Sequence, residues 1–180
     1  MRDDAGTRGN GAAGDRLAGE DAFGRIVLGA VAGFCATMVM TAAMRALHAR
    51  LEPQDRYPLP PREITEGTLP VEGRAAGIAT ILTHFGYGAV TGAIFGALPR
   101  GVPGLLYGPA VWAASYLGWI PAANILKPAT RHPAERNLLM LAVHLVWGGC
   151  LAFGLRELEA SSRGAFGSGR LHDRPEGSQR

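Results

Sequence analysis

Between Glu72 and Glu135 the chain contains no aspartate and no glutamate, although it has 15 acidic residues in all. A helix of a soluble protein carries polar and charged residues along the face that meets water. A segment of this length without a single acid therefore indicates that lipid, not water, surrounds it. The sequence predicts an integral membrane protein.

Four apolar blocks account for most of the chain. A helix needs about 20 predominantly apolar residues to cross a hydrocarbon core that is ~30 Å thick. The blocks cover residues 26–47, 75–98, 105–126 and 137–155. We therefore expect an all-α fold, in which residues 23–158 form a four-helix transmembrane bundle.

Polar tails flank this domain. Residues 1–22 and 159–180 are rich in Gly, Arg and acidic residues, and they cannot bury enough apolar surface to offset the entropy of ordering. We expect both tails to be disordered. Four spans would place both termini on one side of the membrane, and we favour the cytoplasmic side because long polar tails are simplest to leave untranslocated.

The composition excludes several classes of function. The pI of about 9.2 arises from arginines scattered over tails and loops, so no basic stripe for nucleic acid is present. Cys35 and Cys150 both lie in apolar blocks, which argues against a disulfide scaffold. The chain has no GxSxG, no HExxH and no phosphate-binding loop. A non-enzymatic protein is expected. The preference for Arg over Lys, with abundant Ala and Gly, is typical of a G+C-rich bacterial genome.

Glycines recur at four-residue spacing inside the blocks, which places them on one face of each helix. Lipid offers no hydrophobic gain for helix association, so small residues that permit close approach are expected at helix contacts. In the third block, Pro121 should kink the helix. The spaced glycines are Gly29 and Gly33 in the first block and Gly88, Gly92 and Gly96 in the second.

Two histidines lie inside the blocks, and ionisable residues in a bilayer are costly enough to suggest a function. His84 and His144 share the pattern His-x-x-aromatic-Gly, and each lies roughly 12 to 15 Å from the start of its block at the rise of an α-helix. We expect both to point into the bundle at a similar depth. Met40 and Met44 of the first block fall near the same level.

Three interpretations of these four residues remain open. Imidazole and thioether are ligands for haem iron and copper, so His84, His144, Met40 and Met44 predict a haem or metal site. The second interpretation, which we favour, gives the histidines hydrogen bonds to neighbouring helices and no cofactor. The third is a proton or ligand pathway in a minimal transport unit, formed by several copies.

The loops supply a second group of candidate residues. The segment 48–74 holds five prolines, and Pro61 can open a short helix over residues 62–65 because proline suits a first helical turn. Basic residues near the predicted membrane surface are candidates for contacts to anionic head groups. These are Arg62, Arg131, His132 and Arg136.

Two short motifs, Pro58-Leu59-Pro60-Pro61-Arg62 and His144-Leu145-Val146-Trp147, resemble those of the YagU-like family of small bacterial inner-membrane proteins. The order of spans and loops is similar too. The resemblance implies a multi-pass protein of the bacterial plasma membrane, linked to acid stress. The function expected from the sequence is an interaction or stress-linked module of unknown ligand, with the lipid bilayer and a second copy or another membrane protein as partners.

Overall fold

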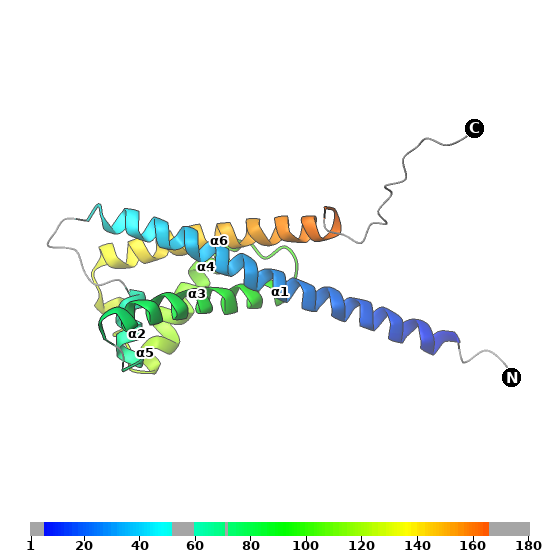
Figure 1. The fold of residues 1–180 in the computed structure, drawn as a ribbon, viewed down its shortest axis with the longest axis horizontal. Coiled ribbons are helices and arrows are strands. Elements are labelled where there is room, and N and C mark those ends of the chain that lie inside the picture. The colour runs from blue at the N-terminus through cyan, green and yellow to red at the C-terminus, as the bar shows by residue number, and fades with distance from the viewer. Residues whose placement is uncertain (1–5, 52–59, 71, 166–180) are drawn as a thin grey trace, which may run out of the picture.

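The computed structural model describes residues 6–51, 60–70 and 72–165, and all regular structure within these ranges is helical (Figure 1). Three long helices form the framework: α1 (Gly6–His48), α3 (Gly73–Ala97) and α6 (Ala134–Arg163). Each is long and apolar enough to cross a membrane. The spans predicted at residues 26–47, 75–98 and 137–155 are confirmed as helices of that kind.

Shorter helices connect the three long ones. In chain order they are α2 (Pro60–Thr68), α4 (Gly104–Ala113), the π-helix η2 (Ala114–Trp119), α5 (Ile120–Ala122) and the 3-10 helix η3 (Ala129–Arg131). The short helix predicted after Pro61 is present as α2, which begins one residue earlier and extends to Thr68.

The third predicted span, residues 105–126, is not one continuous helix. It divides into α4, η2 and α5, with a non-helical backbone at Gly118 (φ −107°, ψ −106°). Pro121 explains much of the break, because its ring excludes the carbonyl of residue i−4 and it has no N–H to donate. The kink expected at Pro121 is therefore present, but it takes the form of an interrupted helix. Three candidate membrane-spanning helices are found in the described part of the chain, not four.

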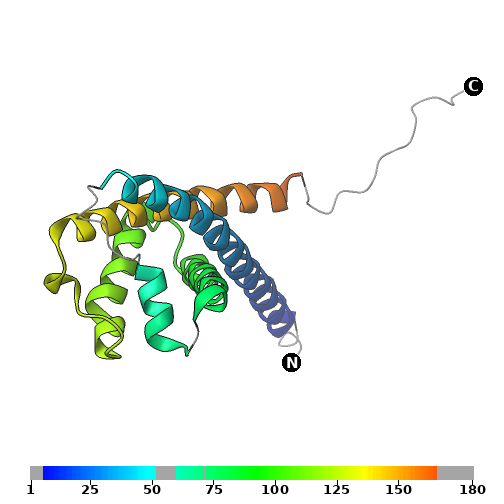
Figure 2. The ribbon, with the colours of Figure 1, turned by 60° about the vertical axis from the view of Figure 1, so that its left-hand side comes forward.

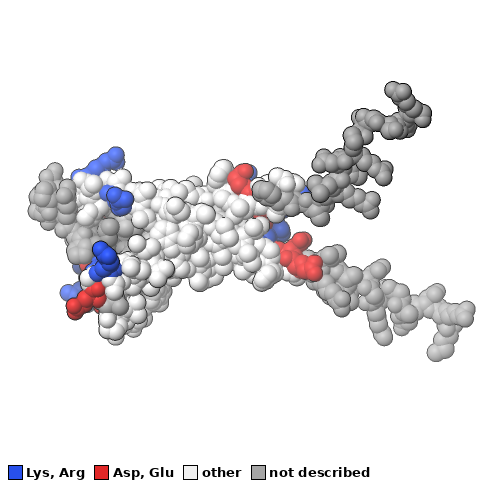
Figure 3. Space-filling view, viewed as in Figure 1, with Lys and Arg blue, Asp and Glu red and all other residues white. Residues whose placement is uncertain are grey.

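The surface of the framework is apolar between two charged ends. Figure 3 shows Lys, Arg, Asp and Glu gathered at the two ends of the visible face and an uncharged band between them. Large apolar side chains are exposed along this band, and a patch of that size marks contact with lipid or protein. Examples from the three long helices are Val31, Phe34, Ile81, Leu82, Val90 and Phe153.

Both helices that approach the termini are longer than the sequence predicts. α1 begins at Gly6, inside the segment 1–22 that we expected to be disordered, and α6 ends at Arg163, beyond residue 159. Once a span is helical, each further residue adds one hydrogen bond without a new nucleation cost. The remaining parts of the two predicted tails, residues 1–5 and 166–180, lie outside the described residues.

An ion pair joins α1 to α6 at this end of the molecule. The Arg25 Nε donates to a Glu159 carboxylate oxygen at 2.6 Å, and the same guanidinium donates to the Leu98 carbonyl at 3.0 Å. Arg100 lies 3.9 Å from the same carboxylate. The beginning of the α1 span, the end of α3 and the end of the α6 span therefore lie at one end of the framework.

Glycines bring α1 and α3 into backbone contact. A Cβ atom added at Gly92 would lie 2.7 Å from the Gly33 Cα, and one added at Gly33 would lie 2.8 Å from the Gly92 Cα. Gly29, Gly88 and Gly96 lie equally close to the facing helix. The expectation that the spaced glycines lie at a helix contact is confirmed for this pair of helices, which lie side by side in both views (Figures 1 and 2).

A second glycine contact joins α4 to α6. A Cβ atom at Gly108 would lie 2.9 Å from the His144 carbonyl carbon, and Gly104 and Gly148 face each other at the same closeness. We call the region of these two glycine contacts the glycine-packed half. It also holds the core around Trp147, whose indole N–H donates to the Thr37 Oγ1 at 3.1 Å.

Candidate functional site

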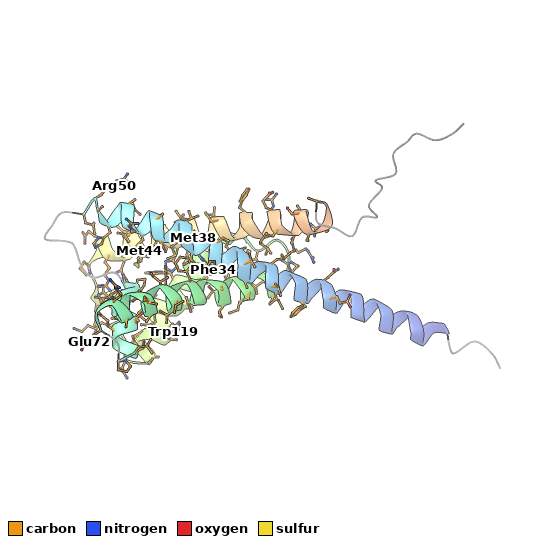
Figure 4. The ribbon with its side chains drawn as sticks, viewed as in Figure 1. Phe34, Met38, Met44, Arg50, Glu72 and Trp119 are labelled. Atoms are coloured by element: carbon orange, nitrogen blue, oxygen red, sulfur yellow. The ribbon has the colours of Figure 1, made fainter. Side chains whose placement is uncertain are left out.

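A cavity of about 280 Å³ lies beyond the glycine contacts, toward the end of the framework that carries α2. Side chains from α1, α2, α3, α4, η2, α5 and α6 line it. Two of the lining residues, Met44 and Trp119, are labelled at that end of the molecule in Figure 4. We call this region the cavity half.

The cavity follows from the same four-residue rows that hold the glycines. His84 lies four residues before Gly88 on α3, and Trp112 lies four residues after Gly108 on α4. His144 lies four residues before Gly148 on α6. Residues four apart share a face, so each row that allows close contact in one half presents a large side chain in the other. The helices diverge where the glycines end.

The π-helix η2 forms one wall of the cavity, where it presents Ser115, Tyr116 and Trp119. The Ser115 hydroxyl donates to the Val111 carbonyl at 2.7 Å, so the Tyr87 hydroxyl, 2.7 Å away, donates to Ser115. This bond ties α3 to η2 across the cavity wall. Single turns of π-helix occur frequently at functional sites, because the extra residue redirects the side chains of that turn.

The helix α2 closes the cavity with Pro60, Pro61, Ile64 and Thr68. Its hydroxyl at Thr65 lies 3.2 Å from the Thr83 hydroxyl of α3. Figure 2 shows α2 between α3 and the segment of α4 to α5.

A buried ion pair holds α2 in place. Both oxygens of the Glu63 carboxylate on α2 accept from the Arg136 guanidinium at the start of α6. The Arg136 side chain is 6% exposed, and its Nε donates to the Tyr116 hydroxyl at 2.9 Å. A bidentate pair with a third partner fixes geometry as well as charge. The pair therefore joins α2, η2 and α6 beside the cavity.

His144 has a defined tautomer. Its Nδ1 lies 2.7 Å from the Met140 carbonyl oxygen, which can only accept a hydrogen bond. Nδ1 therefore carries the proton, and Nε2 of the neutral ring keeps its lone pair. This nitrogen is free to accept a hydrogen bond or to bind a metal.

Two polar atoms of the lining residues are buried without a hydrogen-bond partner in the protein: His84 Nε2 and Trp112 Nε1. Buried polar groups in native proteins are almost always paired, and each exception needs an explanation. A third such atom in the described residues, Asn137 Oδ1, belongs to a residue that does not line the cavity. The orphaned atoms of His84 and Trp112 are therefore a property of this site.

The four ligand candidates from the sequence all line this one cavity: His84, His144, Met40 and Met44. Both histidines lie on the cavity wall, as expected from their shared pattern. No group of three or more His, Cys, Asp or Glu side chains suited to a metal ion occurs in the described residues. Any metal at this site would therefore need thioether ligands in addition to the two imidazoles.

The four basic candidates do not form one cluster for head groups. Arg131 is exposed and Arg62 pairs with Glu66 at 2.6 Å, whereas Arg136 is buried against Glu63. The burial of Arg136 departs from the expected head-group contact, because an acid from the folded-back α2 takes its place. The His132 Nε2 lies 3.0 Å from the Lys127 carbonyl.

Sequence reasoning missed two contributors to the site. Met140 lines the cavity beside His144, and Trp112 supplies an orphaned N–H. Their positions in the sequence could have identified both as lining residues, since Met140 precedes His144 by four residues and Trp112 follows Gly108 by four. Comparison with models of protein families, with curated proteins and with solved structures gives no match for this chain.

Proposed function

We propose that this protein is a multi-pass membrane protein that binds a small ligand in the cavity between its helices, without catalysing a reaction on it. The observation that carries the proposal is the pair of orphaned polar atoms, His84 Nε2 and Trp112 Nε1, on the wall of an otherwise largely apolar cavity. Ligand sites are typically apolar, with a few polar groups that fix orientation. A ligand with its own polar atoms would satisfy both.

The proposal includes a fourth, interrupted crossing. A continuous α-helix over Gly104 to Ala122 would span about 28 Å, close to the hydrocarbon thickness. The interruption at η2 lines the cavity, and broken helices at membrane depth are tolerated where they border a cavity. The ion pair between Arg25 and Glu159 supports termini on one side, for which we propose the cytoplasmic side of a bacterial inner membrane.

Two other functions have less support. A haem has less support because it is a large ligand, and this cavity of about 280 Å³ lies at the lower limit of the volumes typical of ligand sites. A conducting pathway through one copy would have to cross the glycine-packed half. There, Gly33 and Gly92 bring two backbones together, and Gly104 and Gly148 bring two more. A stress-linked role would act through the bound ligand.

The test compares two substitutions of the same type. Ile64→Phe adds a ring on the cavity wall, whereas Ile78→Phe adds one at a lipid-facing position of α3 that is 54% exposed. Protein extracted from membranes in mild detergent is examined by native mass spectrometry. We expect the wild type and Ile78→Phe to carry the same bound mass and Ile64→Phe to lose it. An identical spectrum for all three proteins, with no bound mass, would overturn the proposal.

A further inference from the structure

We propose that the ligand of this cavity is a soft monovalent metal ion, Cu(I), held by methionine thioethers and histidine imidazoles. The inference rests on the proposed function, since it names a metal ion as the ligand that takes the unpaired nitrogen of His84 at the same site, whereas the Trp112 N–H, which can only donate, would pair with a water molecule or anion bound beside the ion. It is carried by the identity of the side chains that surround the cavity, by the tautomer of His144 and by the absence of acids among the described residues of the cavity wall.

Sulfur is concentrated at the cavity. The structure describes four methionines, and three of them line the cavity: Met40, Met44 and Met140. The fourth, Met38, is 58% exposed on the outer face of α1. Packing alone does not require thioethers here, because leucine fills similar volumes. Thioether sulfur is a soft ligand that selects Cu(I).

The two histidines each supply a ring nitrogen without a protein partner, and the tautomer of His144 is defined. Metal-bound histidine almost always donates its other ring N–H to a carbonyl or carboxylate, which fixes the ring and its tautomer. His144 makes this bond to the Met140 carbonyl at 2.7 Å and keeps a lone pair on Nε2. The Nε2 of His84 is buried with no protein partner. One nitrogen on each ring is thus left for a ligand.

The charge expected for the ion follows from the residues that line the cavity. Among the described residues that line the cavity, none is an Asp, Glu or Cys. The cost of moving an ion out of water rises with the square of its charge, and it is large even for a single charge in an apolar medium. A divalent ion without an anionic ligand is therefore disfavoured. A monovalent ion is eased further by aromatic faces, which Trp112, Tyr116 and Trp119 provide.

The experiment measures Cu(I) binding by full-length protein in detergent, under anaerobic reducing conditions, in competition with a chromophoric Cu(I) chelator. We expect one Cu(I) per chain for the wild type, with both sulfur and nitrogen neighbours in X-ray absorption. The double variant Met40→Leu/Met44→Leu should bind at least about tenfold more weakly, because even an outer-shell partner is worth 10–100-fold in metal affinity. Ag(I), which is stable in air and is measured without a reductant, should bind in the same way.

Matched control variants distinguish the loss of a metal ligand from the loss of folded protein. Met38→Leu removes the exposed methionine of the same helix, and His48→Ala removes a histidine that does not line the cavity. Both should bind Cu(I) as the wild type does, whereas His84→Ala should weaken binding. Elution volume and melting temperature check that each variant is folded.

Three outcomes would overturn the metal assignment. They are no Cu(I) bound by the wild type, equal affinity in Met40→Leu/Met44→Leu and Met38→Leu, or Zn²⁺ bound as tightly as Cu(I). If Cu(I) fails while an organic mass is lost on Ile64→Phe, the cavity remains a ligand site and only its metal is wrong. If neither ligand is found, the proposed function fails as well.

Discussion

The two halves of the helical framework differ in how close the backbones come. In the glycine-packed half, α1 meets α3 and α4 meets α6 with no room for a single added carbon at Gly33, Gly92 or Gly108. In the cavity half the same helix faces carry His84, Trp112 and His144 around about 280 Å³ of space. Residues at four-residue spacing on the same helix faces thus bring the backbones into contact in the glycine-packed half and line the cavity in the cavity half.

The halves also differ in how they satisfy polar groups. In the glycine-packed half the Trp147 indole donates to Thr37, and the Tyr107 hydroxyl donates to the Thr91 carbonyl at 2.7 Å. In the cavity half the Trp112 indole has no such partner. Membrane helices have no water with which to pair such groups. We infer that the first half supplies stability and that the second is kept incomplete for a ligand.

The largest effect is expected from Gly92→Leu. Its side chain would meet the Gly29 carbonyl and the Gly33 Cα, which are backbone atoms that no rotamer change can move. Extra methylenes in a well-packed core cost about 1–3 kcal/mol where side chains and backbone can shift, so a leucine that forces α1 away from α3 should cost at least about 3 kcal/mol. Melting of the detergent-solubilised protein, followed by elution volume, measures this loss.

Gly86→Leu is the matched control on the same helix. A Cβ atom at Gly86 meets nothing within 4 Å, so the substitution replaces a poor helix former on an outer face. Its melting temperature should equal or exceed that of the wild type. Equal losses in Gly86→Leu and Gly92→Leu would show that the glycine row does not form a helix contact, and the contrast between the halves would fail.

The next effect tests the closure of the cavity by α2. Glu63→Gln removes the carboxylate that pairs with the buried Arg136 guanidinium, and breaking such a pair from one side costs about 3 kcal/mol, because a buried charge loses its counter-charge. Hydrogen exchange of the α2 amides should quicken, since α2 loses its link to α6. Melting and exchange are measured together.

Glu66→Gln provides the control, with the same chemical change on the same helix. Glu66 pairs with Arg62 where both side chains are largely solvated, and exposed i,i+4 pairs contribute about 0.3–0.5 kcal/mol. Its α2 exchange should match that of the wild type. If the two variants behave alike, the Glu63–Arg136 pair does not hold α2 over the cavity.

The sequence predicts the helical framework because the thickness of a membrane sets the length of a helix that crosses it. Three uninterrupted apolar blocks of the chain have that length. It also predicts that His84 and His144 point into the bundle at a similar depth, since each lies one turn from a glycine, and both line the same cavity. The sequence does not predict that the break in the third block takes the form of the π-helix η2. Pro121 signals a kink, but only packing around Ser115 and Tyr116 decides where the extra residue of the π-helix lies.

The ion pair beside the cavity is a second feature that the sequence does not predict. Glu63 and Arg136 are 73 residues apart in the chain, and no periodicity links them. Their contact depends on how α2 folds back across the ends of α3 and α6, which is a property of the tertiary structure. A basic residue near a span end was therefore assigned to lipid head groups, although its partner is an acid of the protein.

The smallest effect separates the buried Trp147 from the half-buried Trp112 and tests the contrast in polar groups. Trp147→Phe removes the indole N–H that donates to Thr37 at 3.1 Å, and the loss of one hydrogen bond costs about 1 kcal/mol. Trp112→Phe removes an N–H that has no partner in the protein, so the ligand-free protein loses no hydrogen bond and is relieved of an unsatisfied donor. Both changes remove a similar part of the ring, so the difference between the two melting temperatures reports the hydrogen bond.

We expect Trp147→Phe to melt lower than the wild type and Trp112→Phe to melt at or above it when the ligand has been removed. If Trp112→Phe is the more destabilised of the two, the Trp112 indole has a structural partner, and the cavity half is as complete as the glycine-packed half.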